Sequence, residues 1–123
     1  MKYIKTFENI HNLTLYHGTS LNNAISLVNN GWQPYSGNIG GNIGQNKYLY
    51  LTNEPENARW FANEKGEDTI VEVSNVPLEY LKPDPEDEAG FTMKELLNRI
   101  DKTGLPASFV LYKDLNSDHF KII

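Results

Sequence analysis

Two short groups of residues in this sequence carry side chains that suit the binding of a flat ligand. The first is Tyr16-His17-Gly18-Thr19-Ser20, and the second is Tyr48-Leu49-Tyr50-Leu51-Thr52. A histidine ring donates or accepts a hydrogen bond, a glycine lets a ligand approach the backbone, and tyrosine faces stack on flat or cationic rings. Each group alone also has an ordinary explanation, since His-Gly pairs occur where strands end and aromatic residues favour strands. Their joint order along the chain favours a binding site.

A strand and a helix are expected around the first group. The alternation of residues over 13–17 predicts a strand that ends at Gly18. Ser20 is a typical helix N-cap, because its hydroxyl can accept a bond from an unpaired backbone N–H of the first turn. The helix is expected over about 21–30, with Gly31 as its C-terminal cap.

A loop and a second strand-helix pair follow. Residues 31–46 are rich in glycine and asparagine, which predicts a loop that is able to flex over a ligand. Residues 48–52 have the composition of a strand. The segment Asn53-Glu54-Pro55-Glu56 is typical of a helix start, with a capping side chain, acids and an early proline. The second helix is therefore expected over about 55–65.

The C-terminal half adds strands, a helix and an acidic segment. β-branched residues predict a strand over 69–73, and a short helical turn is expected at 77–81. The run Lys82-Pro83-Asp84-Pro85-Glu86-Asp87-Glu88 concentrates proline and carboxylates, which predicts an exposed acidic loop. A helix at 92–101 and strands at 109–112 and 120–123 complete the order.

This order predicts the α+β class rather than strict βαβ alternation. Several short strands are expected to form two small sheets flanked by helices, with a cleft between them. A chain of 123 residues is long enough for one core and too short for two, so we expect a single domain over 1–123. Residues 1–12 are expected to form a short helix on the body or a loosely attached arm.

The composition excludes several classes of protein. The formal net charge of −5 provides no global positive field that would hold a nucleic-acid backbone. Without cysteine there is no disulfide framework, no zinc-cysteine site and no thiol nucleophile. No apolar run approaches the about 20 residues of a membrane-spanning helix, and the start lacks the apolar stretch of a signal peptide. We therefore expect a soluble, cytoplasmic chain without a membrane partner.

The histidines and the glycine-rich loop are poor candidates for metal or phosphate binding. His11, His17 and His119 are scattered and show no ligand spacing, so no metal is expected. The Gly-x-x-Gly steps of the loop lack the Gly-Lys-Ser/Thr ending of a nucleotide P-loop and do not open a helix.

The joint order of the two groups resembles the first two motifs of the ADP-ribosyltransferases, a family described by a His, a Tyr and a Glu on three core strands. His17 matches the first position and Tyr50 the second. The helix that follows in the family is matched by Ala58, Phe61 and Ala62, and the third strand by Pro106-Ala107-Ser108-Phe109-Val110-Leu111-Tyr112. The resemblance covers about residues 13–123 and implies a split pair of small sheets around an NAD cleft.

The resemblance also implies roles for individual residues, with NAD as the co-substrate. The backbone of Gly18 would bond the nicotinamide carboxamide, and His17 would bond a ribose hydroxyl of the adenosine half. Tyr50 and Phe61 would stack on the cationic nicotinamide ring. Further candidates for NAD binding are Thr19, Ser20, Tyr48 and Trp60.

The third motif departs from the family pattern, because Ser108 stands where the family has a glutamate. That glutamate bonds the 2′-hydroxyl of the nicotinamide ribose and favours the positive charge that develops at the anomeric carbon. A serine can bond the hydroxyl but brings no negative charge. A substitute acid from Asp114, Asp118 or the loop 84–88 is conceivable, and nothing in the sequence places any of them in the cleft. The candidate catalytic residues are His17, Tyr50 and Ser108.

These observations favour a mono-ADP-ribosyltransferase that moves ADP-ribose from NAD to a macromolecular acceptor, a protein in preference to a nucleic acid. Two alternatives stay open: an impaired relative that only binds NAD or ADP-ribose, and a partner-binding domain that shares only the scaffold. We expect a monomer. The basic and aromatic residues at the start of the chain are similar to those of short proteins of tailed bacteriophages. Such an origin would suit an effector that acts in the host cytoplasm.

Overall fold

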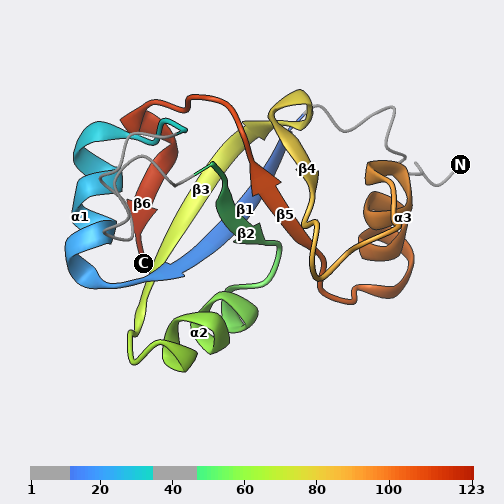
Figure 1. Cartoon of the computed structure of the whole chain (residues 1–123), viewed down its shortest axis with the longest axis horizontal. Coiled ribbons are helices and arrows are strands. Elements are labelled where there is room, and N and C mark those ends of the chain that lie inside the picture. Colours follow the sequence, from blue (N-terminus) through green and yellow to red (C-terminus); the bar gives the residue numbers. More distant parts are fainter. Residues whose placement is uncertain (1–11, 35–46) are drawn as a thin grey trace, which may run out of the picture.

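The computed structural model describes residues 12–34 and 47–123, and within these ranges the chain forms three α-helices and a six-stranded antiparallel sheet (Figure 1). The strands are β1 (Asn12–Thr19), β2 (Leu49–Thr52), β3 (Thr69–Pro77), β4 (Leu81–Pro83), β5 (Ser108–Leu111) and β6 (Phe120–Ile122). The helices are α1 (Leu21–Asn30), α2 (Pro55–Glu64) and α3 (Met93–Thr103), with short 3-10 turns η2 (Leu78–Tyr80) and η3 (Ser117–His119). The mixed α+β class predicted from the sequence is confirmed. The predicted N-terminal helix or arm and the glycine-rich part of the predicted loop lie outside the described residues.

The sheet consists of two halves that meet at a single backbone pair. The strand order is β4-β5-β2-β1-β3-β6. β1 pairs with β3 along most of its length, and β2 pairs with β5 throughout, whereas β1 and β2 pair only through Tyr16 and Thr52. The expectation of two separate sheets is therefore wrong, because this pair continues the backbone hydrogen bonding from one half to the other. Beyond the pair the two central strands separate.

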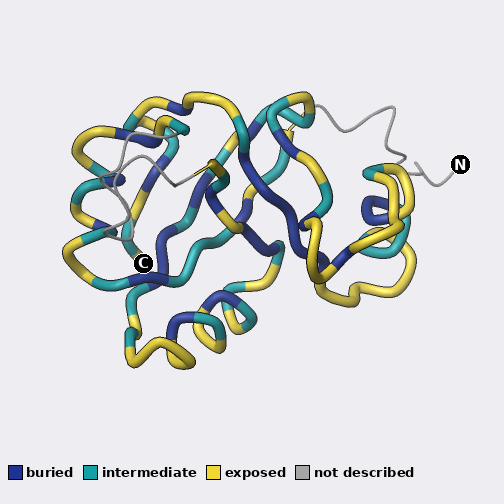
Figure 2. The backbone as a smooth tube through the Cα atoms, viewed as in Figure 1, coloured by how far each residue is buried: buried dark blue, intermediate teal, exposed yellow. Residues whose placement is uncertain are grey.

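Each helix covers a different part of the sheet (Figure 1). α2 packs on β1, β2 and β3, α1 lies beside β6 and β3, and α3 contacts β4 at the opposite edge. Buried residues follow the strands, while the outer faces of the helices are exposed (Figure 2). The main core combines side chains of both halves, among them Leu15, Leu51, Val73, Phe109 and Leu111. This arrangement leaves α2 as the wall that faces the separation of β1 and β2.

The predicted start and end of α1 are confirmed. The Ser20 hydroxyl accepts a hydrogen bond from the Asn23 backbone N–H at 3.2 Å, and the Gly31 N–H bonds the Leu27 carbonyl at 2.8 Å. Gly31 has a φ of 73°, a region in which a side chain would be strained. The first residue group of the sequence is thus held at a strand end by a well-capped helix.

The predicted side-chain cap of α2 is wrong, although the helix itself is where the sequence places it. Glu54 is the N-cap and its side chain makes no capping bond. The Asn53 side chain instead accepts a hydrogen bond from the Ala107 backbone N–H at 2.8 Å. The Asn53 side chain, which the local sequence pattern predicts to cap the helix, therefore bonds a distant part of the chain instead. This hydrogen bond joins the end of β2 to the start of β5.

Gly18 is required by the contact between β1 and α2. A Cβ atom at this position would stand 1.9 Å from the carbonyl oxygen of Ala58 and 3.0 Å from the Cβ of Ala62. Both alanines are almost fully buried, so α2 cannot shift away from β1 without opening a void in the core. The glycine of the first motif thus serves the packing of α2 against the strand.

Among the described residues, no helix has the length and apolar character needed to cross a membrane.

We expect Gly18→Ala to destabilise the fold by about 2 to 4 kcal/mol, because the added methyl group overlaps the backbone of α2. Gly66→Ala is the control: it has no neighbour within 4 Å of a new Cβ, and its φ of 76° costs about 1 kcal/mol. Chemical denaturation of the three proteins measures the difference. Equal losses for the two variants would contradict the packing argument.

Candidate functional site

A cavity of about 260 Å³ opens where β1 and β2 separate. β1 contributes Tyr16, His17 and Gly18, β2 contributes Tyr50, Leu51 and Thr52, and α2 contributes Ala58, Phe61 and Lys65. The remaining wall is formed by Asp84, Glu86, Asp87 and Ser108. The volume lies just below the range of about 300 to 1,000 Å³ that is usual for small-molecule sites. It suits the head group of a ligand whose remainder extends outside.

The structure brings together five of the residues proposed from the sequence as site residues. They come from four elements and line the same cavity: His17, Gly18, Tyr50, Phe61 and Ser108. Residues that are distant along the chain therefore converge at the point where the sheet divides.

Thr19 and Ser20 lie outside the cavity lining and take part in the start of α1. The Asn23 side chain donates to the Thr19 hydroxyl at 3.2 Å, and the Ser20 hydroxyl accepts from the backbone of the same asparagine. Tyr48 and Trp60 also lie outside the lining. Each packs edge-on against a ring that does line it, with centroids 6.3 Å apart for Tyr48 and Tyr50 and 5.1 Å apart for Trp60 and Phe61.

His17 links the two halves of the sheet through its side chain. Its Nδ1 lies 2.7 Å from the carbonyl oxygen of Tyr50. In the register set by the Tyr16 and Thr52 pair, that carbonyl would face β1 if the strands continued together. Because a carbonyl oxygen only accepts, we assign the proton to Nδ1. The Nε2 atom is then left as an acceptor for a hydroxyl group.

The imidazole of His17 stays neutral near pH 7. Burial lowers its pKa to about 4 from an ordinary value of 6.5, the hydrogen bond to Tyr50 opposes this change, and the charge of Lys65 adds to it. A neutral ring with a fixed proton is suited to positioning a ligand hydroxyl rather than to pairing with a phosphate.

Tyr50 presents an accessible aromatic ring beside acidic groups. Its side chain is 48% exposed, and its pKa is raised by partial burial and by the charges of Asp84 and Glu86, with a further contribution from Tyr48. The hydroxyl is therefore protonated at neutral pH. Phe61 lines the cavity from α2, so two aromatic residues from different elements border one space.

Thr52 carries a polar group that lacks a partner. The residue is only 2% exposed, and its hydroxyl oxygen is buried with no hydrogen bond. A buried hydroxyl without a partner costs about 1 to 3 kcal/mol, and such groups call for an explanation. Since Thr52 lines the cavity, a ligand hydroxyl is one partner that would satisfy it.

The acidic loop is exposed as predicted at Pro85, Glu86 and Asp87, and the prediction is wrong for Asp84 and Glu88, which are buried. Asp84 and Glu88 are each only 6% exposed, although the segment was expected to be a solvated loop. Asp84 Oδ1 accepts backbone N–H bonds from Glu86 at 2.8 Å and Asp87 at 3.2 Å, which closes the turn. Asp84 is therefore buried at the cavity, while the middle of the turn stays exposed to solvent.

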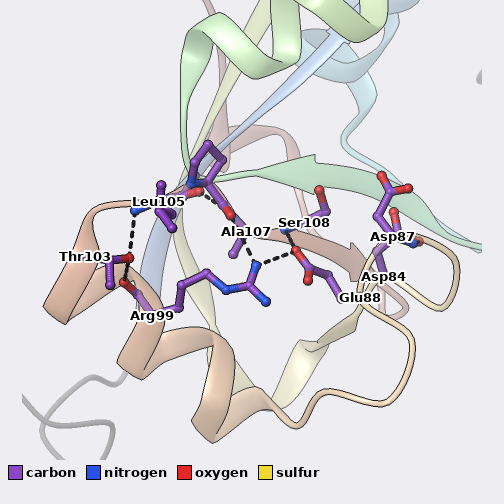
Figure 3. A network of polar contacts seen from close by, with 10 residues as sticks. Asp84, Asp87, Glu88, Arg99, Thr103, Leu105, Ala107 and Ser108 are labelled. Atoms are coloured by element: carbon purple, nitrogen blue, oxygen red, sulfur yellow. Dashed lines mark hydrogen bonds and ion pairs between the residues drawn. The ribbon is translucent and has the colours of Figure 1, made fainter.

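Glu88 fixes this turn to the start of β5. Its Oε2 accepts hydrogen bonds from the Arg99 side chain and from the Ser108 backbone N–H, both at 3.0 Å. Arg99 also donates to the Pro106 carbonyl at 3.3 Å, so it reaches from α3 across to the segment before β5 (Figure 3). An ion pair between distant parts of the chain thus positions Ser108 and the acidic residues together.

The charges around the cavity favour a cation. Three carboxylates, from Asp84, Glu86 and Asp87, line it against the single ammonium of Lys65, while His17 is neutral. The pKa of Asp87 is raised, mainly by burial and to a smaller extent by the charges of Asp84 and Glu88. Asp114 and Asp118, the other substitute acids considered from the sequence, are not among the residues that line this cavity.

No family model, curated protein or solved structure matches the chain. Within residues 12–34 and 47–123, no group of three or more histidine, aspartate or glutamate side chains is arranged to hold a metal ion. The cavity itself is therefore the feature that points to a function.

We expect the free energy of unfolding to fall between pH 6.5 and about 4 because of His17. A histidine whose pKa is lowered on folding binds its proton more readily in the unfolded chain, so this contribution is complete above pH 6.5 and is lost toward pH 4. The loss reaches up to about 3 kcal/mol. His17→Gln keeps a donor for the Tyr50 carbonyl and removes the titrating imidazole. The free energy of unfolding of this variant should therefore change less than that of wild type between pH 6.5 and about 4. NMR titration of the His17 ring checks the cause, and a midpoint near 6.5 would contradict it.

We expect Glu88 and Arg99 to be energetically coupled by about 1 to 3 kcal/mol in a double-mutant cycle to alanine, because the pair is largely buried. The matched control is Arg59 and Asp68, an ion pair of similar length whose side chains are 47% and 73% exposed. That surface pair should couple by less than about 1 kcal/mol. Similar coupling energies in both cycles would show that the Glu88 pair does not hold the turn.

Proposed function

We propose that the chain binds NAD in this cavity and transfers ADP-ribose to a macromolecular acceptor, as a mono-ADP-ribosyltransferase. One observation carries the proposal: His17 and Tyr50, the two residues that match the first two family motifs, are joined by a hydrogen bond and border the same cavity as Phe61 and Ser108. Nothing in their separation along the chain requires this convergence.

The character of the cavity supports nicotinamide as its ligand. The nicotinamide ring of NAD is flat and cationic, so it is suited to the faces of Tyr50 and Phe61 and to an acidic lining. The small volume accommodates the ring and the attached ribose, with the rest of the dinucleotide outside. Gly18 contributes backbone to the lining, which is where the family bonds the carboxamide.

The transfer proceeds by exchange of one bond at the anomeric carbon of the nicotinamide ribose. The bond to the ring nitrogen breaks and its electron pair leaves with nicotinamide, which becomes neutral. A new bond forms to an oxygen or nitrogen of the acceptor, whose proton passes to solvent. The residues around the cavity hold the ribose and stabilise the positive charge that develops on it.

An NAD-binding module without turnover is the alternative that one observation favours. Ser108 stands at the family's glutamate position, lines the cavity and brings no charge of its own. Such a module would bind NAD or ADP-ribose and release no nicotinamide. A protein acceptor, a monomeric state and a cytoplasmic location stay predictions from the sequence.

We expect the purified chain to bind NAD and to release nicotinamide while labelling a protein in a cell lysate supplied with labelled NAD. Tyr50→Ala should weaken NAD binding about tenfold, because it removes one face of the ring site. Ile25→Ala is the control, since Ile25 is an apolar residue of α1 that is 43% exposed, close to the 48% of Tyr50, and lies outside the cavity lining. Calorimetry measures the binding, and mass spectrometry the released nicotinamide.

Three results separate the possibilities. Binding with release and label transfer supports the transferase. Binding without release favours the binding module. Absence of NAD binding, or equal effects of Tyr50→Ala and Ile25→Ala, would contradict the assignment of this cavity to nicotinamide.

A further inference from the structure

A row of polar residues crosses the sheet at the cavity. β5 lies between β4 and β2, and Ser108 is paired with Thr52 on the β2 side. On the other side, β4 and β5 pair through Pro83 and Phe109, so the next position in the same register sets Asp84 opposite Ser108. The Asp84 N–H bonds the Ser108 carbonyl at 3.1 Å, which confirms that the two backbones stay together there.

Side chains that stand opposite each other on antiparallel strands share one face of the sheet, with Cβ atoms about 4.5 to 5.5 Å apart. Asp84, Ser108 and Thr52 accordingly all line the same cavity. A carboxylate therefore reaches the site from the residue that follows β4, beside the strand on which the resemblance places the family's glutamate.

Asp84 is held in this place with little freedom. It is 6% exposed, and one carboxylate oxygen is occupied by the two backbone N–H groups of the turn. The Glu88 and Arg99 pair fastens the far end of the turn to Ser108 (Figure 3). The hydroxyl of Thr52, at the other end of the row, is buried and has no hydrogen-bond partner within the protein.

We propose that Asp84 is the acidic catalytic residue of this site, bonding the nicotinamide ribose together with Ser108 and Thr52. The inference rests on the proposed function and adds the residue that supplies negative charge. The oxygen of Asp84 that the turn leaves free accepts a ribose hydroxyl and stabilises the positive charge that grows at the anomeric carbon as the ring nitrogen leaves with its electron pair. Asp84 forms no bond to carbon.

The test compares wild type with Asp84→Asn and with Asp114→Asn. An asparagine keeps an oxygen that accepts the two backbone bonds of the turn, so the variant removes charge while preserving the local fold. Asp114 is an exposed acid outside the cavity lining and gives the same substitution as a control. Nicotinamide release and the dissociation constant of NAD are measured for each protein, with thermal unfolding as a check of folding.

We expect Asp84→Asn to slow nicotinamide release by about a hundredfold or more, with NAD affinity changed by less than about tenfold. Asp114→Asn should match wild type. Release at the wild-type rate from a folded Asp84→Asn protein would overturn the inference and leave the proposed function standing. If wild type binds NAD without releasing nicotinamide, the catalytic role of Asp84 is refuted. If wild type binds no NAD, the proposed function fails and the inference fails with it.

A second variant decides the matter even if Asp84→Asn does not fold. Ser108→Glu places a carboxylate at the family position. If Asp84 already supplies the charge, the added glutamate should raise nicotinamide release by less than about threefold, because the transition state is already stabilised and the two acids repel each other. A gain of about tenfold or more would show that the site lacks a working acid and would overturn the inference.

Discussion

The site depends on one constraint, which is that β1 and β2 pair at a single position and then separate. Tyr16 and Thr52 join the two halves of the sheet. Beyond this pair, the imidazole of His17 bonds the Tyr50 carbonyl, which a backbone N–H of β1 would bond if the strand pairing continued. Where the backbone pairing of the two strands stops, the His17 side chain supplies the hydrogen-bond donor for this carbonyl. Because the strands separate here, a gap opens in the middle of the sheet, and this gap is the cavity.

The walls of the cavity follow from how the neighbouring elements close around this gap. Gly18 allows α2 to approach β1 until the carbonyl of Ala58 occupies the space of a side chain, which brings Phe61 and Lys65 to the opening. On the other side, the Glu88 and Arg99 pair fixes the end of the acidic turn beside Ser108. The result is a small space with aromatic residues and a surplus of carboxylates, and this combination favours a flat cation.

Local patterns in the sequence predicted much of the framework. The cap at Ser20, the glycine that ends α1 and the positions of α2 and α3 all follow from interactions within a few residues of one another, and the structure confirms them. His17, Gly18, Tyr50, Phe61 and Ser108 were named as site residues from the sequence, and all line one cavity.

What the sequence could not predict depends on contacts between distant segments. Asp84 and Glu88 look like solvated acids, because the partners that bury them, Ser108 and Arg99, come much later in the chain. The capping side chain expected at Asn53 is likewise used by Ala107. The joining of the two sheet halves rests on one backbone pair, which no periodicity reveals. An acidic run next to a proline is compatible with either an exposed loop or a turn closed by its own aspartate.

The most direct test of the central claim is a crystal structure of the chain with NAD or nicotinamide. We expect the nicotinamide ring between Tyr50 and Phe61, its carboxamide on the backbone of Gly18 and the ribose hydroxyls against the row formed by Asp84, Ser108 and Thr52. A cavity that stays empty at saturating ligand, or a ligand bound elsewhere on the molecule, would contradict the account.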